Sequence, residues 1–469
     1  MLSTKNLRLK YPNGEHKIFD GLNLTIHDKE KVLLLGPSGA GKSTLLNVLS
    51  GIVPELIELP MKYDELHIDE HCGMIFQDPD TQFCMPKVKE ELGFILENRQ
   101  VPRSEMDQAI QHALDSVGLN VDPGQYVNQL SGGMKQKLAI AETLLQQAET
   151  LFLDEPTAML DTEATAELWS KIKDFWEDQT VVIVEHKVEH IWEHIDRVIL
   201  LNYNAEIIAD DKPEAILSQH EELLTEYGVW HPNAWDYAPK AQDTPSTPTE
   251  PVFRYQDGAI RRGNKTLIAL DEFTVSLGEW ITITGKNGTG KTTLLESMMQ
   301  LIKYDGKMTY NGHVLKKIKD AAQHMYLVYQ NPELQFITQS VYDEIFIQFS
   351  QKDNKEAQQQ TEDMLRLLNL ERVQNQHPFE LSMGQKRRLS VATALSSPAD
   401  IIMLDEPTFG LDSHNTFNLI QLFQERVAQG QTIIMITHDP EIIARYPSRQ
   451  IHVEDQQLHE VRKTGDMHV

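Results

Sequence analysis

The sequence predicts an α/β fold with a mainly parallel sheet, present twice in one chain. Short apolar segments alternate with amphipathic helical patterns, an order typical of a parallel sheet covered by helices. Five blocks recur after 249 to 253 residues: GPSGAGKST (36–44) as GKNGTGKTT (285–293), FQDPDTQF as YQNPELQF, QLSGGMKQKLAIAETL as ELSMGQKRRLSVATAL, LFLDEPTAMLD as IIMLDEPTFGLD, and VVIVEH as IIMITH. An offset this constant indicates that a whole domain is duplicated.

The length of the chain agrees with this duplication, because 469 residues exceed what one ordinary core holds. We expect one domain at 1–235, a second at 252–469, and a linker at 236–251. The linker reads DYAPKAQDTPSTPTEP, a composition typical of extended chain, with an ordered surface loop as the alternative. Fully extended, it would reach roughly 50 Å, enough for the two domains to face each other.

Composition narrows the class of protein. The net charge of -27 argues against nucleic acid as the main partner, because phosphate binding needs clustered Lys and Arg. The only two cysteines, Cys72 and Cys84, fit no zinc spacing and are typical of a reducing cytosol. The N-terminus carries no apolar signal segment, and the longest apolar runs are far shorter than a spanning helix requires. We therefore expect no membrane crossing by this chain itself.

Two glycine-rich loops carry the most specific signal for chemistry. Each fits the P-loop pattern, follows an apolar strand pattern and opens a helix. Glycines let backbone N–H groups surround phosphate, and the helix N-terminus favours negative charge. The lysine should reach the β- and γ-phosphates, and the next hydroxyl should bind Mg²⁺. The predicted nucleotide-binding residues are Gly36, Pro37, Ser38, Gly39, Ala40, Gly41, Lys42, Ser43 and Thr44, and in the second copy Gly285, Lys286, Asn287, Gly288, Thr289, Gly290, Lys291, Thr292 and Thr293.

An Asp–Glu pair ends the next repeated strand in each copy. Asp154 and Asp405 are suited to holding Mg²⁺, and the adjoining Glu155 and Glu406 to polarising an attacking water. As an isolated dipeptide, such a pair would more often open a turn before proline; its place in the repeat favours catalysis.

A histidine, His186 in the first copy and His438 in the second, closes the following strand. Its place suits a contact to the γ-phosphate or to the catalytic glutamate, although a lone histidine is more often structural.

Together these motifs, in this order, resemble the nucleotide-binding domains of ABC transporters, over nearly the whole chain outside the linker. The Leu-Ser-x-Gly element is the family's signature. The resemblance implies a mainly parallel core sheet, an antiparallel β subdomain and a helical signature subdomain in each copy, with ATP and Mg²⁺ as cofactors. It also implies that Gln77 and Gln330 touch Mg²⁺ and water, and that Tyr11 and Tyr255 stack on adenine. Asp161 and Asp412 match the family's interface loop.

In this family two domains sandwich two ATP molecules, and each P-loop is completed by the other domain's signature, within one chain or in a dimer. The resemblance thus pairs the Lys42 site with Ser382 and Gly384, and the Lys291 site with Ser131 and Gly133. Both serines precede helical patterns, where an N-cap belongs. Met383 replaces the Gly132 of the first copy, which could restrict the backbone. We expect two working sites of unequal rate.

The shared Gln-x-Pro-x-x-Gln-Phe segment resembles the energy-coupling-factor (ECF) group, whose ATPases drive uptake of vitamins and metal ions. Fused tandem forms resemble the minority linked to thiamine or its hydroxymethylpyrimidine precursor. The implied partners are integral membrane subunits, and the implied location is the cytoplasmic face of the cell membrane. A sugar-import tandem ATPase is the nearest rival, and a soluble ABC protein acting on ribosomes is another. The latter typically carries a long charged insert, whereas this linker is short and rich in proline.

Overall fold

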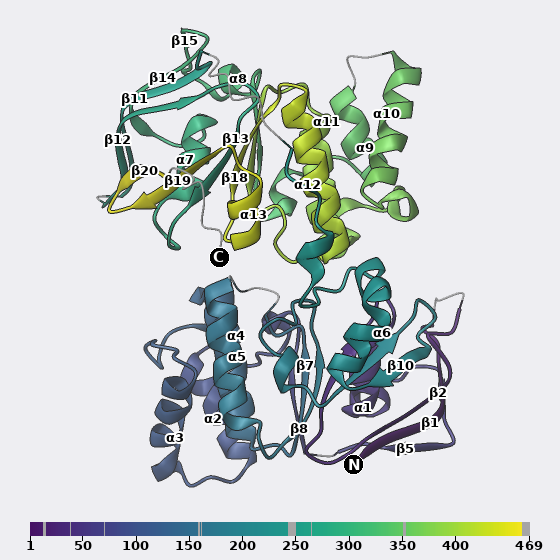
Figure 1. Cartoon of the computed structure of the whole chain (residues 1–469). Helices are drawn as coiled ribbons and strands as arrows, with labels where there is room; N and C mark the ends of the chain where they lie inside the picture. Colours follow the sequence, from purple (N-terminus) through teal and green to yellow (C-terminus); the bar gives the residue numbers. More distant parts are fainter. Residues whose placement is uncertain are drawn as a thin grey trace. The chain divides into compact units, whose positions relative to one another are not determined.

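The computed structural model describes residues 1–12, 16–37, 39–69, 71–157, 160, 162–242, 250–263, 265–349 and 353–461. The chain divides into two compact domains, Met1–Tyr237 with Asp412–His414, and Ala238–Leu411 with Asn415–Val469. Each domain contains the predicted α/β architecture, with one mainly parallel sheet and one antiparallel sheet (Figure 1).

The first domain is built on a six-stranded sheet with the order β10-β9-β3-β8-β7-β6, parallel except for the β9–β10 pair. A four-stranded antiparallel sheet is formed by β1, β2, β4 and β5. The strands are β1 (Leu2–Leu9), β2 (Phe19–Ile26), β3 (Lys31–Leu35), β4 (Met61–Lys62), β5 (Glu65–His67), β6 (Cys72–Ile75), β7 (Thr150–Asp154), β8 (Thr180–Val184), β9 (Arg197–Leu201) and β10 (Ile207–Asp211). The helices are α1 (Lys42–Leu49), α2 (Val88–Asn98), α3 (Arg103–Ser116), α4 (Gly132–Gln146), α5 (Thr162–Phe175) and α6 (Pro213–Glu226).

The second domain repeats this plan, with sheet orders β16-β17-β18-β13-β19-β20 and β12-β11-β14-β15. Its strands are β11 (Phe253–Arg262), β12 (Lys265–Val275), β13 (Trp280–Thr284), β14 (Tyr304–Tyr310), β15 (His313–Val314), β16 (Met325–Val328), β17 (Ile401–Asp405), β18 (Thr432–Ile436), β19 (Arg449–Glu454) and β20 (Gln457–Val461). Its helices are α7 (Lys291–Met298), α8 (Ile318–Ala321), α9 (Val341–Phe346), α10 (Asn354–Leu367), α11 (Met383–Ser396), α12 (Ser413–Ala428) and α13 (Pro440–Arg445).

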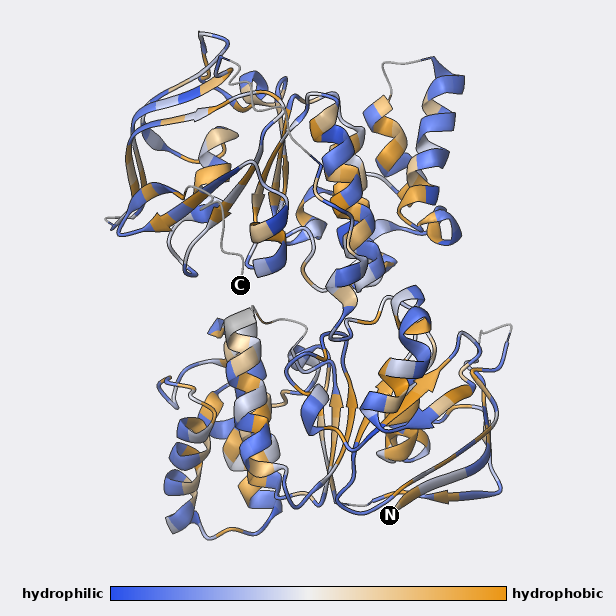
Figure 2. Cartoon of the chain, in the orientation of Figure 1, coloured by the Kyte–Doolittle hydropathy of each residue, from blue (hydrophilic) through white to orange (hydrophobic). Residues whose placement is uncertain are grey.

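The central strands are apolar on both faces (Figure 2), which explains their unbroken hydrophobic runs. In β3, Val32 and Leu34 join the core shared with the antiparallel sheet, whereas Leu33 and Leu35 join the core that includes α2, α3 and α4. The alternation follows from the two-residue period of a strand. Because both faces of β3 are packed in this way, the carboxyl end of the strand, where the P-loop starts, is held between the two cores.

Part of the expected linker is packed rather than extended. The Pro239 carbonyl accepts a hydrogen bond from Tyr446 (2.7 Å), and the Gln242 N–H donates to Gln424 (2.7 Å), both within the second domain. Residues 243–249 lie outside the described residues, so extended chain there stays a prediction. Within the described ranges, no helix combines the length and apolar character needed to span a bilayer.

Candidate active sites

Both P-loops have the backbone that their glycines predict. Gly36 and Gly285 have φ values of 146° and 139°, and a Cβ on either would lie 2.6 Å and 2.5 Å from a carbonyl oxygen of the neighbouring strand. Lys42, at the start of α1, donates to the carbonyls of Gly36 (2.8 Å) and Pro37 (2.9 Å). Lys291 donates equivalently to Gly285 (2.6 Å) and Lys286 (3.0 Å). Each ammonium group is therefore held inside its loop by carbonyl oxygens, at the N-terminus of a helix, where negative charge is favoured.

The hydroxyl after each lysine is bonded to the strand-terminal aspartate. Ser43 donates to Asp154 (2.9 Å), and Thr292 donates to Asp405 (2.6 Å). Burial raises the pKa of Asp154 to about 6, opposed by the Ser43 hydrogen bond, and burial also raises the pKa of Asp405. A hydroxyl and a carboxylate are the hard oxygen donors that Mg²⁺ prefers. The residues present therefore fit a magnesium ion bound beside each P-loop.

Glu155 and Glu406 share an uncommon backbone conformation. Their φ values are 48° and 52°, in the left-handed region that side chains other than glycine rarely adopt. Backbone hydrogen bonds hold each one, from Glu155 N to Val184 O (2.8 Å) and from Glu406 N to Ile436 O (3.0 Å). Strain of this kind at the same place in both domains is typical of a functional constraint.

In the first domain, Glu155 is the centre of a polar network. Gln77 donates to its Oε2 (2.6 Å), and the His186 Nε2 lies 2.9 Å from its Oε1. Burial opposes the charged carboxylate, but His186 and Lys42 outweigh it and lower the pKa of Glu155. Burial likewise opposes protonation of His186, but the Glu155 carboxylate prevails and raises the pKa of the ring. Three predicted site residues are thus brought together as an ionic pair with an amide donor.

The described residues of the second domain do not form this network around Glu406. The His438 Nε2 is 3.6 Å from the Glu406 Oε1, which is buried and accepts no hydrogen bond from the residues that the structure describes. Burial, together with the neighbouring Asp405, raises the pKa of Glu406 to about 8. The exposed Gln330 side chain has no hydrogen-bond partner among the described residues. The two predicted catalytic carboxylates therefore differ in the direction of their pKa shift and in their hydrogen-bond partners.

The signature serines are the predicted N-caps. Ser131 accepts from the Met134 N–H at the start of α4, and Ser382 accepts from Gln385 N–H at the start of α11, both at 3.4 Å. Gln385 also accepts from the Ser382 N–H (2.9 Å), a capping box that Met134 prevents in the first domain. Met383 begins α11 and does not have a positive φ, so replacing glycine there strains nothing. Gly133 and Gly384 lie in the same first turns.

The two tyrosines expected at adenine differ. Tyr11 is 42 % exposed, and its hydroxyl lies 3.0 Å from the Thr44 hydroxyl of the P-loop helix. Tyr255 is fully buried in β11, with its hydroxyl bonded to the Asp305 carbonyl (2.9 Å). It has no free ring face, so the stacking prediction for Tyr255 is wrong.

Strand register shows which residue stands in the position of Tyr11. Leu9 pairs with Phe19, and Ile260 pairs with Ile268, while Phe19 and Ile268 both lie against the last P-loop glycine of their domain. Counting two residues on from Leu9 gives Tyr11, just past the end of β1, and counting two on from Ile260, across the register shift between Ile260 and Arg261, gives the exposed Arg262. Arg262 is therefore the candidate at this position, and a search for an aromatic residue does not find it.

Glu185 is a second residue that the motifs did not identify. It is buried, accepts from the Thr157 hydroxyl (2.7 Å) and accepts from the His186 N–H (2.8 Å). It thus fixes the loop that carries His186. A comparison of VVIVEH with IIMITH could have identified Glu185, because the second domain has Thr437 at the same position.

Some predicted residues are placed only by position. Ser38 and Asp161 lie outside the described residues, and Asp412 directly precedes α12. The loops and first helical turns described above also contain the remaining P-loop positions, which are Gly39, Ala40, Gly41, Asn287, Gly288, Thr289, Gly290 and Thr293.

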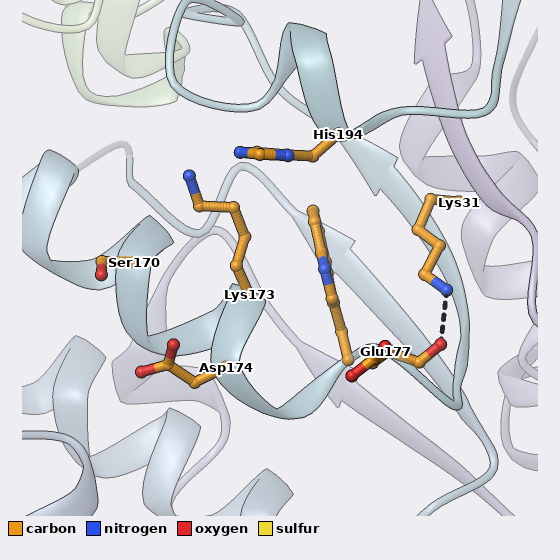
Figure 3. Close-up of a pocket in the computed structure, with 7 residues that line it drawn as sticks. Lys31, Ser170, Lys173, Asp174, Glu177 and His194 are labelled. Atoms are coloured by element: carbon orange, nitrogen blue, oxygen red, sulfur yellow. Dashed lines mark hydrogen bonds between the residues drawn. The ribbon is translucent and has the colours of Figure 1, made fainter.

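A surface pocket of about 380 Å³ in the first domain is separate from this machinery. Its lining includes Lys31, Lys173, Glu177 and His194, and Lys31 donates to the Glu177 carbonyl (2.8 Å; Figure 3). Charges of both signs line it, and none of the predicted site residues is among them.

Comparison with known proteins agrees with this geometry. A family model described as "ABC transporter" matches residues 19–158 and 270–409. The "Putative HMP/thiamine import ATP-binding protein YkoD" of Bacillus subtilis is 32 % identical, over 97 % of this chain and 90 % of that protein. A "Putative ABC transporter ATP-binding protein" of Methanosarcina mazei is 30 % identical, over 95 % and 86 %.

Solved structures extend the comparison to the fold. The archaeal ribosome recycling factor aABCE1, in complex with the ribosomal stalk protein aP1, aligns with a TM-score of 0.68 at 20 % identity, over 98 % of this chain and 90 % of that one. A structure titled "RNase-L Inhibitor" gives the same TM-score and identity. At this identity, the likeness concerns the fold alone.

Proposed function

Because the chain belongs to the ABC transporter family, we propose that it is the ATP-hydrolysing subunit that energises a membrane importer. ATP hydrolysis itself follows from the two ABC domains. The relatives named as transport ATP-binding proteins support the transport role.

In the proposed first site, Lys42 neutralises charge on the β- and γ-phosphates, and backbone N–H groups of the loop bind the phosphate oxygens. Ser43 and Asp154 would hold Mg²⁺, which when bound neutralises the charge that develops on the phosphates. Glu155 accepts a proton from the attacking water, and His186 orients Glu155 through their 2.9 Å contact. Tyr11 offers its exposed ring to adenine.

The second site uses the counterparts Lys291, Thr292, Asp405, Glu406 and His438. Its adenine side differs, since Arg262 would supply a planar guanidinium in place of the tyrosine ring. We further propose, from the family resemblance, that the signature serine of each domain completes the phosphate site of the other.

One observation carries the transport role: an exposed apolar pair lies in the segment that follows Gln330. Leu334 and Ile337 are 69 % and 74 % exposed, in and just after the 3₁₀ turn Pro332–Gln335. Buried Glu344 holds this segment by accepting the N–H groups of Ile337 (3.0 Å) and Thr338 (2.8 Å). Exposed apolar side chains on a fixed backbone are suited to docking a partner's apolar helix.

The same segment is tied to the signature helix in both domains. Lys386 of α11 pairs with Glu333 (2.5 Å), and Lys135 of α4 pairs with Asp80 (2.5 Å). Movement of the signature helix during an ATP cycle would therefore move the docking segment. This connection supports a role in which nucleotide state is passed to a membrane subunit.

We propose that the partners are the integral membrane subunits of an ECF-type importer, with this chain peripheral on the cytoplasmic face. The Bacillus subtilis relative makes thiamine or its hydroxymethylpyrimidine precursor the first solutes to test.

The experiment is isolation of the tagged chain from its native cells, with membranes and ribosomes fractionated separately. We expect integral membrane subunits to co-isolate, and Leu334→Asp with Ile337→Asp to reduce that recovery more than about tenfold while ATP binding is kept. Val314→Asp with Ile318→Asp is the matched control, since these residues are 42 % and 50 % exposed in the same domain. Recovery with ribosomes and none with membranes would contradict the proposal.

A further inference from the structure

The position five residues after the signature serine differs between the two domains. It is Gln136 in α4 of the first domain and Arg387 in α11 of the second. Both side chains are buried, at 0 % and 3 % exposure. A buried arginine requires a nearby acceptor or anion to offset the loss of water.

Arg387 lies behind the catalytic end of β17. Helix α11 packs on β16 and β17, and an Arg387 Nη donates to the Tyr329 carbonyl (3.3 Å). Val328 pairs with Leu404, so the next residues along, Tyr329 and Asp405, are neighbours at the strand ends. The guanidinium therefore lies at the end of the sheet where Asp405 and Glu406 begin their loop.

Two polar atoms remain unsatisfied in this region. Among the described residues, the buried Arg387 Nε and the buried Glu406 Oε1 have no hydrogen-bond partner. Two positive charges act on the carboxylates of Asp405 and Glu406: Arg387 has the larger effect on Asp405, and Lys291 of the P-loop has the larger effect on Glu406. Adjacent buried carboxylates repel each other, so a cation beside them stabilises their charged forms strongly in this weakly screened interior.

In the first domain, different residues support the catalytic carboxylate. Gln136 is neutral and donates to the Pro156 carbonyl (2.6 Å). Its catalytic carboxylate, Glu155, is held instead by Gln77 and His186. In the second domain, the corresponding Gln330 makes no such bond and His438 is farther away, at 3.6 Å.

We propose that Arg387 is a positioning residue of the second hydrolysis site, holding Glu406 and Asp405 by its buried charge where Gln77 and His186 hold Glu155 in the first. This inference rests on the proposed catalytic role of Glu406. It implies that hydrolysis at this site depends on a positive charge at position 387, whereas ATP affinity, which depends on the P-loop, does not.

The test measures kcat, KM for ATP and binding of a fluorescent ATP analogue in the full chain. Each Arg387 variant is made in two backgrounds, the otherwise wild-type chain and the chain that carries Glu155→Gln. In the second background, Glu406 supplies the remaining hydrolysis. Arg387→Gln installs the first domain's residue, and Arg387→Met is a neutral variant suited to a buried site. In the chain that carries Glu155→Gln, both should lower kcat about tenfold or more, with KM and analogue binding changed less than about twofold, whereas the otherwise wild-type chain keeps the hydrolysis of its first site. Arg387→Lys should keep most of kcat. Arg388→Gln, one position along α11, is the charge-matched control.

The outcomes separate the two proposals. In the chain that carries Glu155→Gln, normal kcat in Arg387→Gln or Arg387→Met, or an equal loss of kcat in Arg387→Lys, overturns the inference, and so does a parallel rise in KM. Melting temperatures identify a variant that fails to fold, in which case Arg387→Met replaces Arg387→Gln. If Glu406→Gln in the same background hydrolyses ATP normally, the proposed role of Glu406 fails; if it is inactive while Arg387→Met is active, only the inference about Arg387 fails.

Discussion

The buried carboxyl group of Glu142 gives a prediction about stability that is independent of nucleotide. Glu142 lies in α4, is 2 % exposed, and accepts a hydrogen bond from Gln82 (2.7 Å) through one oxygen, while its other oxygen has no partner among the described residues. Burial, and then the nearby Glu91, raise its pKa well above the ordinary value of 4.5. The folded domain therefore keeps a proton on Glu142 at pH values where the unfolded chain has lost it.

The sign and size of the effect follow from proton linkage. Below about pH 4.5 both states are protonated and Glu142 carries no penalty. Above it the folded state binds one more proton than the unfolded state, so the free energy of unfolding falls by about 1.4 kcal/mol for each pH unit until the folded pKa is reached. Glu142→Gln keeps the size of the side chain and an acceptor for Gln82, but removes this loss. The stability advantage of the variant should therefore grow as the pH rises above 4.5, by about 1.4 kcal/mol per pH unit until the folded pKa of Glu142 is reached.

Urea unfolding at pH 5, 6 and 7, followed by tryptophan fluorescence, provides the assay. Five of the six tryptophans, all but Trp280, belong to the first domain, so the signal reports mainly the domain that contains Glu142. A difference between Glu142→Gln and wild type that stays constant over this pH range would show that the folded domain does not hold a proton on Glu142.

Three further predictions concern the ATP sites. Glu406→Gln should lower hydrolysis at its site about 100-fold and leave ATP binding intact, because only the path of the proton is removed; single-turnover hydrolysis and analogue binding measure the two effects, and unchanged turnover would contradict the assignment. Tyr255→Phe should cost about 1 kcal/mol of stability through its lost hydrogen bond to Asp305 and leave KM for ATP unchanged. Arg262→Ala should raise KM for ATP. A raised KM in Tyr255→Phe with an unchanged KM in Arg262→Ala would place Tyr255 at adenine after all. Met383→Gly should not restore activity through a relaxed backbone, since Met383 has no positive φ, and a large gain in kcat would show that its side chain obstructs phosphate.

Short sequence motifs predicted those site residues whose positions depend on backbone conformation within a few residues. The glycines of the P-loops, the hydroxyl–aspartate pairs and the capping serines depend on backbone conformation and strand ends, which short motifs encode. Both β-strand patterns leading to the P-loops and the alternation of strands and helices were confirmed by the structure.

The residues that sequence could not predict depend on packing between distant segments. Tyr255 has the expected residue type, but the alternation of β11 turns it into the core, and only strand pairing identifies Arg262 as the counterpart of Tyr11. The roles of Arg387 and Glu142 follow from their burial against neighbouring strands and turns, whereas in the sequence each is one more charged residue on a helix. The asymmetry between the two sites therefore lies mainly in residues outside the repeated motifs, with Met383 contributing no backbone strain.

In the proposed function, two P-loop sites in this chain power uptake through a membrane partner. We would measure accumulation of radiolabelled hydroxymethylpyrimidine and thiamine by native cells that lack this chain and receive either the wild type or the double variant Glu155→Gln, Glu406→Gln. We expect the wild type to restore accumulation of one of these solutes, whereas the double variant, although it binds ATP, should not. Equal accumulation with both proteins would show that ATP hydrolysis by this chain does not drive the uptake.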